Sequence, residues 1–175
     1  MRRALNERAE NQGHYFNAHL PGKRLTPAGP DHAQIAAMSG IADYLDALYT
    51  RHFRTNLAAD GRVRRVNDLM RDHEVALMKP LLDFLAGRND LRLIGPREAE
   101  RRAPTISVLN DRPGEALAAD LSLHKIMAGG GDFYGRRPVE ALGIDPRHGV
   151  LRLSFLHYTS PQEIDQVIEA LDRVL

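Results

Sequence analysis

The stretch that decides the fold is GVLRLSFLHYTSPQEIDQVIEALDRVL, residues 149–175. Its first part alternates between two faces, which predicts a β-strand with one apolar side. One face carries Leu151, Leu153, Phe155 and His157, and the other carries Arg152, Ser154, Leu156 and Tyr158. The strand therefore holds Arg152 in its middle and on the face away from the apolar one, where a solvated charge is not expected.

The second part of this stretch predicts an amphipathic helix with a defined start. Ser160 fits the N-cap, Pro161 the first helical position, and Glu163 completes a capping box. The apolar residues that follow at helical spacing are Ile164, Val167, Ile168, Leu171 and Leu175. We expect this helix to fold back over the apolar face of the strand.

Two interpretations of Arg152 remain open from the pattern alone. It can be a surface arginine on an edge strand. Alternatively, a rigid strand presents its guanidinium to a carboxylate or phosphate, whose oxygens match the fixed fork of N–H donors. In the second interpretation Ser154 and Tyr158 complete a polar cleft on the same face.

The first half of the chain reads as turns followed by two long helices. Residues 1–30 are polar and rich in proline and glycine, which predicts turns without a periodic element. A helix is expected from Asp31, its N-cap, to about Asn56, and a second from about Arg62 to Ala86, with a break at Asp60-Gly61. We place a domain boundary between residues 57 and 58.

The second half alternates strands and helices in a way that defines its class. Strands are expected at 91–96, at 104–109 and from Ile126, and helices at 115–124 and 138–142. With the closing strand and helix the order is β-β-α-β-α-β-α, which predicts a two-layer α+β sandwich.

Composition excludes several classes of function. The net charge of +1 gives no indication of nucleic acid or of an anionic membrane as a partner. There is no cysteine, hence no disulfide, thiolate metal site or thiol nucleophile. No apolar run is long enough to span a membrane and no signal peptide begins the sequence, so the expected location is the cytoplasm. The eight histidines show no metal-binding spacing, and we expect no metal site.

Two local motifs have structural interpretations that we prefer to functional ones. Gly129–Gly131 lacks the spacing of a phosphate-binding loop and is expected to be a flexible or tightly bent loop. His124-Lys125 could be a cofactor lysine that follows a histidine. It falls, however, at the end of the 115–124 helix, where a cation is favourable against the helix dipole.

Four segments in order resemble the class V aminotransferases, the pyridoxal-phosphate enzymes that include cysteine desulfurases. They are RLTPAGPDHAQIAAMSGIADYL (24–45), RAPTISVLN (102–110), GDFYG with the downstream EALG (131–135 and 140–143), and GVLRLSFLHYTSPQEIDQVIEAL (149–171). The resemblance covers nearly the whole chain. It implies the small α+β domain of a fold-type-I enzyme (58–175), preceded by a remnant of the large cofactor domain with a dimer-interface turn and long helix (1–57).

The resemblance also implies roles for individual residues. Arg152 would bind the α-carboxylate of an amino-acid substrate. Gly29, Asp31 and His32 would lie at a homodimer interface near the cofactor phosphate of the partner subunit. The residues at the active-site mouth would be Gly131, Asp132, Phe133, Tyr134 and His157.

Departures from the family pattern limit what this chain can do by itself. The desulfurase cysteine expected near residues 131–135 is absent, and Tyr158-Thr159-Ser160 stands in place of Tyr-Asn-Thr. None of the lysines 23, 79 and 125 matches the Schiff-base position, so no catalytic residue is assigned. We expect the C-terminal portion of such an enzyme, inactive alone. The alternatives are one subunit of a split enzyme with a lysine-bearing partner chain, and a non-catalytic binding or assembly module.

Overall fold

A computed structural model describes residues 3–26 and 31–175, and it divides into two compact units, 1–66 and 67–175. The first unit contains α1 (Arg3–Arg8), α2 (His32–His52) and the start of α3 (Ala59–Ala86). The second unit contains the rest of α3 and the following elements: β1 (Leu91–Ile94), β2 (Thr105–Asn110), α4 (Gly114–Leu123), β3 (Gly129–Gly131), α5 (Arg136–Ala141), β4 (Val150–Ser154) and α6 (Pro161–Val174). Short 3-10 turns lie at Pro21–Lys23 and Ala99–Arg101.

In the first unit α2 begins where the sequence predicts. The Asp31 carboxylate accepts hydrogen bonds from the backbone N–H groups of Ala33 and Gln34, at 2.9 and 3.2 Å. The helix ends at His52 rather than near Asn56, because Phe53 is already extended. Residues 3–8, for which turns were expected, form the helix α1. The sequence RALNER contains mostly good helix formers, which explains that difference.

The apolar stripe of α2 is exposed along most of its length. Ile35, Met38, Ile41 and Tyr44 are each about half exposed, and Tyr49 is the buried residue of this helix. The Tyr49 hydroxyl donates to the carbonyl of Thr55 at 2.7 Å, and Arg62 at the start of α3 pairs with Asp46 at 2.8 Å. The first unit therefore has few buried side chains of its own.

The second unit is a four-stranded antiparallel sheet with its main core on one face. The strand order is β1-β2-β4-β3. Ile106, Val108, Leu151 and Leu153 point from β2 and β4 into this core. Helices α3, α4 and α6 cover them with Leu77, Met78, Leu81, Leu82, Leu85, Leu117, Leu121, Ile164, Ala170 and Leu171. The sequence-predicted order of strands and helices is confirmed.

The start of α6 has the expected chemistry. The Ser160 hydroxyl accepts from the backbone N–H of Glu163, and the Glu163 carboxylate accepts from the backbone N–H of Ser160 at 2.7 Å. The capping box is therefore confirmed. The same carboxylate contacts explain why the pKa of Glu163 is lowered, first through the backbone N–H and then through the hydroxyl of Ser160.

The predicted strand over 149–158 is shorter than its alternation suggests. Strand β4 ends at Ser154, and the next residues form a turn in which Thr159 donates its N–H to the carbonyl of Leu156 at 2.9 Å. Its hydroxyl accepts from the N–H of Leu156 at 3.3 Å. His157 and Tyr158 therefore lie in a turn rather than on the faces of the strand.

The triple glycine is a strand, so the interpretation of it as a flexible or bent loop is wrong. Gly129–Gly131 pairs with Arg152, Leu151 and Val150 of β4. A Cβ at Gly130 would lie 2.2 Å from backbone atoms of Gly114 and Glu115, at the start of α4. Glycine is needed here because the helix end packs directly on the strand backbone.

The boundary between the compact units lies inside α3, between Val66 and Asn67. The boundary placed at 57/58 from the sequence falls in the connection just before this helix. The assignment of residues 1–57 to a cofactor domain stays a prediction.

Candidate functional site

Arg152 lies on β4 and on the sheet face opposite the main core. Its neighbours in the ladder are Ser107 on β2 and Gly129 on β3. The flanking Leu151 and Leu153 are buried in the core, whereas Arg152 is only partly buried. The alternation predicted for this part of the strand is thus confirmed, and it places a guanidinium in the middle of a rigid sheet.

The guanidinium of Arg152 rests on an aromatic ring. Its Cζ atom lies 3.7 Å from the centroid of the Phe133 ring, the shortest such distance among the described residues. Within residues 3–26 and 31–175 no oxygen accepts a hydrogen bond from the Arg152 guanidinium, and no carboxylate pairs with it. Its N–H donors are therefore available to an anion from outside the described structure.

The loop that carries Phe133 has an uncommon backbone. Phe133 and Tyr134 have φ values of 52° and 60°, in the left-handed region that bulky residues rarely adopt. The loop is fixed by hydrogen bonds from Tyr134 N–H to the Asp132 carboxylate at 3.0 Å and from Gly135 N–H to the Asp132 carbonyl at 2.8 Å. The Tyr134 side chain is fully exposed.

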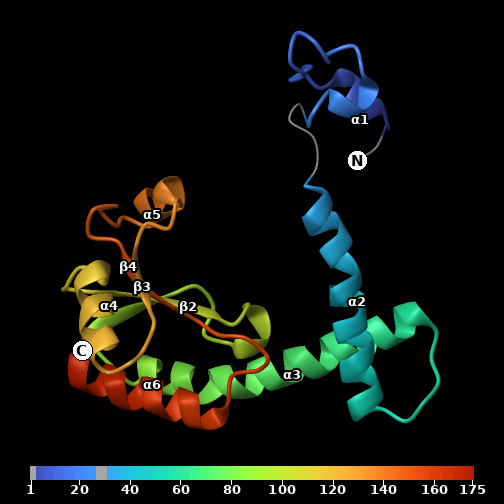
Figure 1. Cartoon of the computed structure of the whole chain (residues 1–175). Coiled ribbons are helices and arrows are strands. Elements are labelled where there is room, and N and C mark those ends of the chain that lie inside the picture. Colours follow the sequence, from blue (N-terminus) through green and yellow to red (C-terminus); the bar gives the residue numbers. More distant parts are fainter. Residues whose placement is uncertain (1–2, 27–30) are drawn as a thin grey trace. The chain divides into compact units, whose positions relative to one another are not determined.

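A small apolar cluster holds the Phe133 ring on this face of the sheet. Its buried members are Val139 of α5, Ile144 and Val150, and Ile94, Leu109 and Phe133 pack against them. Figure 1 shows α5 on the side of the strands away from α3 and α6. The structure thus brings Arg152 together with the 131–135 loop, as one composite surface.

The other residues singled out in the sequence lie elsewhere. His157 is in the turn after β4, where its ring meets that of Tyr158 edge-on at 5.4 Å. Asp31 is the N-cap of α2 and His32 its first residue, in the first unit, while Gly29 lies outside the described residues. The polar cleft expected from Arg152, Ser154 and Tyr158 does not form on one strand face, because β4 ends at Ser154.

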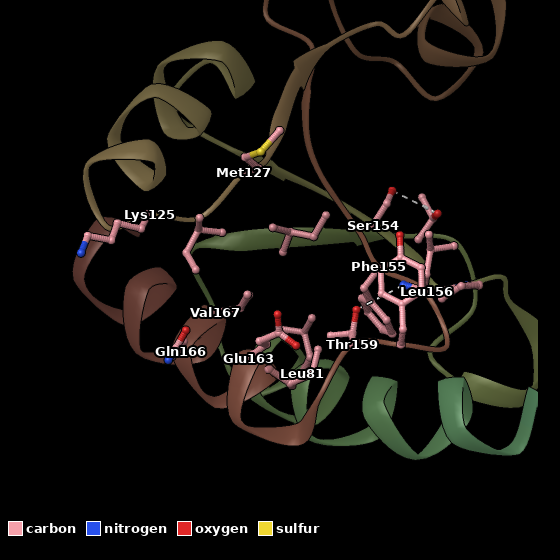
Figure 2. Close-up of a pocket in the computed structure, with 16 residues that line it drawn as sticks. Leu81, Lys125, Met127, Ser154, Phe155, Leu156, Thr159, Glu163, Gln166 and Val167 are labelled. Carbon is pink, nitrogen blue, oxygen red and sulfur yellow. Dashed lines mark hydrogen bonds between the residues drawn. The ribbon is translucent and has the colours of Figure 1, made fainter. Parts of the chain in front are cut away.

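Ser154 and Tyr158 instead line a cavity of about 560 Å³ at the end of β4 (Figure 2). Its walls come mainly from apolar residues, among them Leu81, Leu153, Ile164 and Val167, and Arg152 is not among its lining residues. Lys125 also lines this cavity. Its amino group points away from Glu163 and from the other labelled side chains (Figure 2).

Lys125 follows directly after the end of α4, which confirms the position expected for His124-Lys125. The C-cap of α4 is His124, and the N–H groups of Lys125 and Ile126 donate to the carbonyls of Ser122 and Leu121. This is a Schellman motif in which Lys125, with a φ of 63°, occupies the position usually taken by glycine.

The sequence analysis did not connect two residues with the Arg152 surface. Ser107 alternates with the buried Ile106 and Val108, and this alternation could have placed it on the face opposite the core. Gly129 was noted only as part of the triple glycine, because its place opposite Arg152 depends on the pairing of β3 with β4. Among the described residues, no group of three or more His, Asp or Glu side chains is arranged to hold a metal ion.

Comparison with known proteins supports the family resemblance. No family model matches the chain. The aminotransferase-like protein FGM3 of Gibberella zeae is 26% identical over 179 residues, which cover 99% of this chain and 41% of that protein.

Two solved structures show that the fold is shared with cysteine desulfurases. The cysteine desulfurase CsdA of Escherichia coli matches with a TM-score of 0.61 and 18% identity, over 86% of this chain and 32% of its own. A cysteine desulfurase of Thermococcus onnurineus matches with a TM-score of 0.56 and 22% identity, over 66% of this chain and 29% of its own.

These likenesses confirm the expected fold, which is the helix-covered small antiparallel sheet found in cysteine-desulfurase-like proteins. The chain spans less than half the length of each of these relatives. In the part of the chain that the structure describes, no helix is long and apolar enough to cross a membrane.

Proposed function

We propose that this chain is the substrate-carboxylate-binding part of a cysteine-desulfurase-like enzyme that acts on an amino acid with pyridoxal phosphate. One observation carries the proposal. Arg152 stands on a rigid strand, partly buried, with an aromatic ring against its guanidinium and with no acceptor for the guanidinium N–H groups among the described residues. A partly buried guanidinium in that state is suited to an anionic ligand.

The chemistry of the guanidinium favours a carboxylate. Two parallel N–H groups at the edge of the fork match the two oxygens of a carboxylate, and such bidentate, charge-assisted hydrogen bonds fix orientation as well as affinity. The Ser107 hydroxyl lies beside Arg152 in the ladder, on the same face, and can add a polar contact. The role of this chain in the reaction is then to hold the substrate's α-carboxylate in one geometry.

The lysines of the described structure do not fit covalent attachment of the cofactor. Lys79 pairs with Glu100 at 2.8 Å, and Lys125 is exposed with its amino group turned out of the cavity (Figure 2). Lys23 belongs to the first unit, at the end of a 3-10 turn. Pyridoxal phosphate would supply an electron sink when bound, and we propose that its lysine comes from residues other than these three.

Ligand binding to Arg152 tests the proposal directly. We expect L-alanine, titrated into the full chain at constant ionic strength, to shift the Arg152 Nε–H resonance in a saturable way, and chloride to leave it unchanged. Arg152→Gln should abolish saturable binding. Arg137→Gln changes the charge equally, at an exposed residue of α5, and should bind as the wild type does. Equal binding by both variants would refute the carboxylate site.

Cofactor trapping tests the second part. After incubation with pyridoxal phosphate and reduction with borohydride, we expect no stoichiometric modification of Lys23, Lys79 or Lys125 by peptide mass spectrometry. A single fully modified lysine, above all Lys125, would contradict the assignment and restore His124-Lys125 as a cofactor motif.

One observation favours the split-enzyme alternative, in which this chain acts with a second, lysine-bearing protein. The apolar stripe of α2 formed by Ile35, Met38, Ile41 and Tyr44 is exposed, and such a stripe is suited to cover by protein. Stoichiometric co-purification with a chain that carries a trappable lysine would support it. A homodimer, with Gly29, Asp31 and His32 beside the partner's cofactor phosphate, remains a prediction, as does the cytoplasmic location.

If the chain is a non-catalytic binding or assembly module, Arg152→Gln should leave its partner binding unchanged. If that is observed, and if the wild-type protein also shows no response to L-alanine, the chain is a binding or assembly module and the carboxylate-site proposal is wrong.

A further inference from the structure

We propose that the Phe133 ring positions the guanidinium of Arg152. The ring can lie against the strand for this purpose because Gly129 has no side chain. The inference rests on the proposed function of Arg152 and extends it to residues that do not themselves hold the carboxylate.

The strand register places the three residues together. Gly129 on β3 is the direct ladder partner of Arg152 on β4. A Cβ atom at Gly129 would lie 2.8 Å from Cε1 and 3.0 Å from Cζ of Phe133, so the ring occupies the volume that any side chain at this position would take. Glycine at 129 therefore allows the ring to lie against the strand, next to the arginine.

The contact leaves the binding edge of the guanidinium free. At 3.7 Å from Cζ to the ring centroid, Phe133 covers one face of the planar group. The N–H donors lie in the plane of the guanidinium, so stacking does not use them. An arginine held in this way has lost part of its rotamer freedom before the ligand arrives, which reduces the entropy that binding must otherwise remove.

The backbone of the 131–135 loop indicates that Phe133 positions Arg152 and does not only fill space in the apolar cluster. An aromatic residue at a φ of 52° is unfavourable, and the next residue is also left-handed, at 60°. Residues in such conformations persist where the surroundings over-determine them, and they gather at functional sites. Here the Asp132 turn on one side and the Val139, Ile144 and Val150 cluster on the other hold the ring over β3.

The experiment measures Arg152 with and without ligand in Phe133 and Gly129 variants of the full chain. In the wild type the Arg152 Nε–H resonance should show the upfield ring-current shift of a stacked guanidinium. Phe133→Leu keeps an apolar side chain for the cluster but removes the ring. We expect it to lose that shift and to weaken L-alanine binding about tenfold. Phe133→Tyr should restore both.

Gly129→Ala provides an independent second variant, since its methyl group must displace the ring. We expect the Arg152 shift to fall and L-alanine binding to weaken in the same direction as in Phe133→Leu. The amide spectrum of the buried β2 and β4 residues reports whether each variant keeps the fold.

The two proposals fail differently. If Phe133→Leu and Gly129→Ala keep the fold, the Arg152 shift and the L-alanine affinity, Phe133 does not position Arg152 and the inference is overturned. If the ring-current shift is present and responds to these variants but L-alanine never binds, the positioning stands and the proposed function falls.

Discussion

Replacing Gly130 by alanine should destabilise the second unit, because its missing side chain allows α4 to rest on the sheet. A Cβ at this position would lie 2.2 Å from Glu115 N and from Gly114 C, and real Cβ contacts essentially never fall below 3.0 Å. The strand and the helix backbone would have to separate by about 0.8 Å. Neither can move freely, since β3 is paired to β4 and α4 buries Leu117 and Leu121 in the main core.

Overpacking of this kind costs typically about 1–3 kcal/mol, and a clash between two backbones belongs in the upper part of that range. We therefore expect Gly130→Ala to lower the free energy of unfolding by about 3 kcal/mol. Since domains of this size have urea m-values of about 1–3 kcal/mol per molar, the midpoint should fall by at least about 1 M. Urea unfolding followed by circular dichroism measures the change, and backbone amide exchange of Arg152, the partner of Gly129, reports on the β3–β4 ladder.

Gly87→Ala is the matched control in the same unit. Its Cβ would meet the carbonyls of Phe84 and Asp83 at 3.5 and 3.6 Å, which is ordinary van der Waals contact. We expect a change within about 0.5 kcal/mol. If Gly130→Ala is as mild as Gly87→Ala, residues 129–131 are not held against α4, and the reasoning about the glycine strand is wrong.

Three further predictions concern the helix ends. Ser160→Ala removes the acceptor of the Glu163 N–H and should cost about 1 kcal/mol in urea unfolding, while Ser160→Asp should retain most of the stability. In the folded state Ser160 lowers the pKa of Glu163 below its usual value of 4.5. The Glu163 carboxylate therefore stabilises the protein fully at a pH above 4.5, and this contribution is lost as the pH falls through the lowered pKa. Glu163→Gln should accordingly be less stable than the wild type near neutral pH and approach it in acid; a stability difference independent of pH would contradict the capping role. Lys125→Gly should stabilise the protein by about 1 kcal/mol, because glycine adopts the φ of 63° without strain, whereas a thermal shift no larger than that of Lys125→Ala would show that the position is unstrained.

The local elements could be predicted from the sequence because their signals are short-range. The capping box at Ser160 and Glu163 and the N-cap at Asp31 each depend on residues within one helical turn, and both are present. Alternation along Val150–Ser154 fixed which residues face the core. The strand predicted from the same alternation is wrong beyond Ser154, because the chain forms the Leu156–Thr159 turn there instead of pairing as a strand. Hydrophobic periodicity does not reveal such a turn.

By itself, the sequence determined the order of strands and helices, the apolar faces that form the core, and an arginine in the middle of a strand. Only the tertiary structure decided that Gly129–Gly131 is a strand and that Phe133 stacks on Arg152. Both depend on contacts between segments far apart along the chain: β3 with the start of α4, and the 131–135 loop with β4. A glycine's need for space and a guanidinium's lack of an acceptor are properties of the surroundings, and those surroundings exist only after the segments have packed.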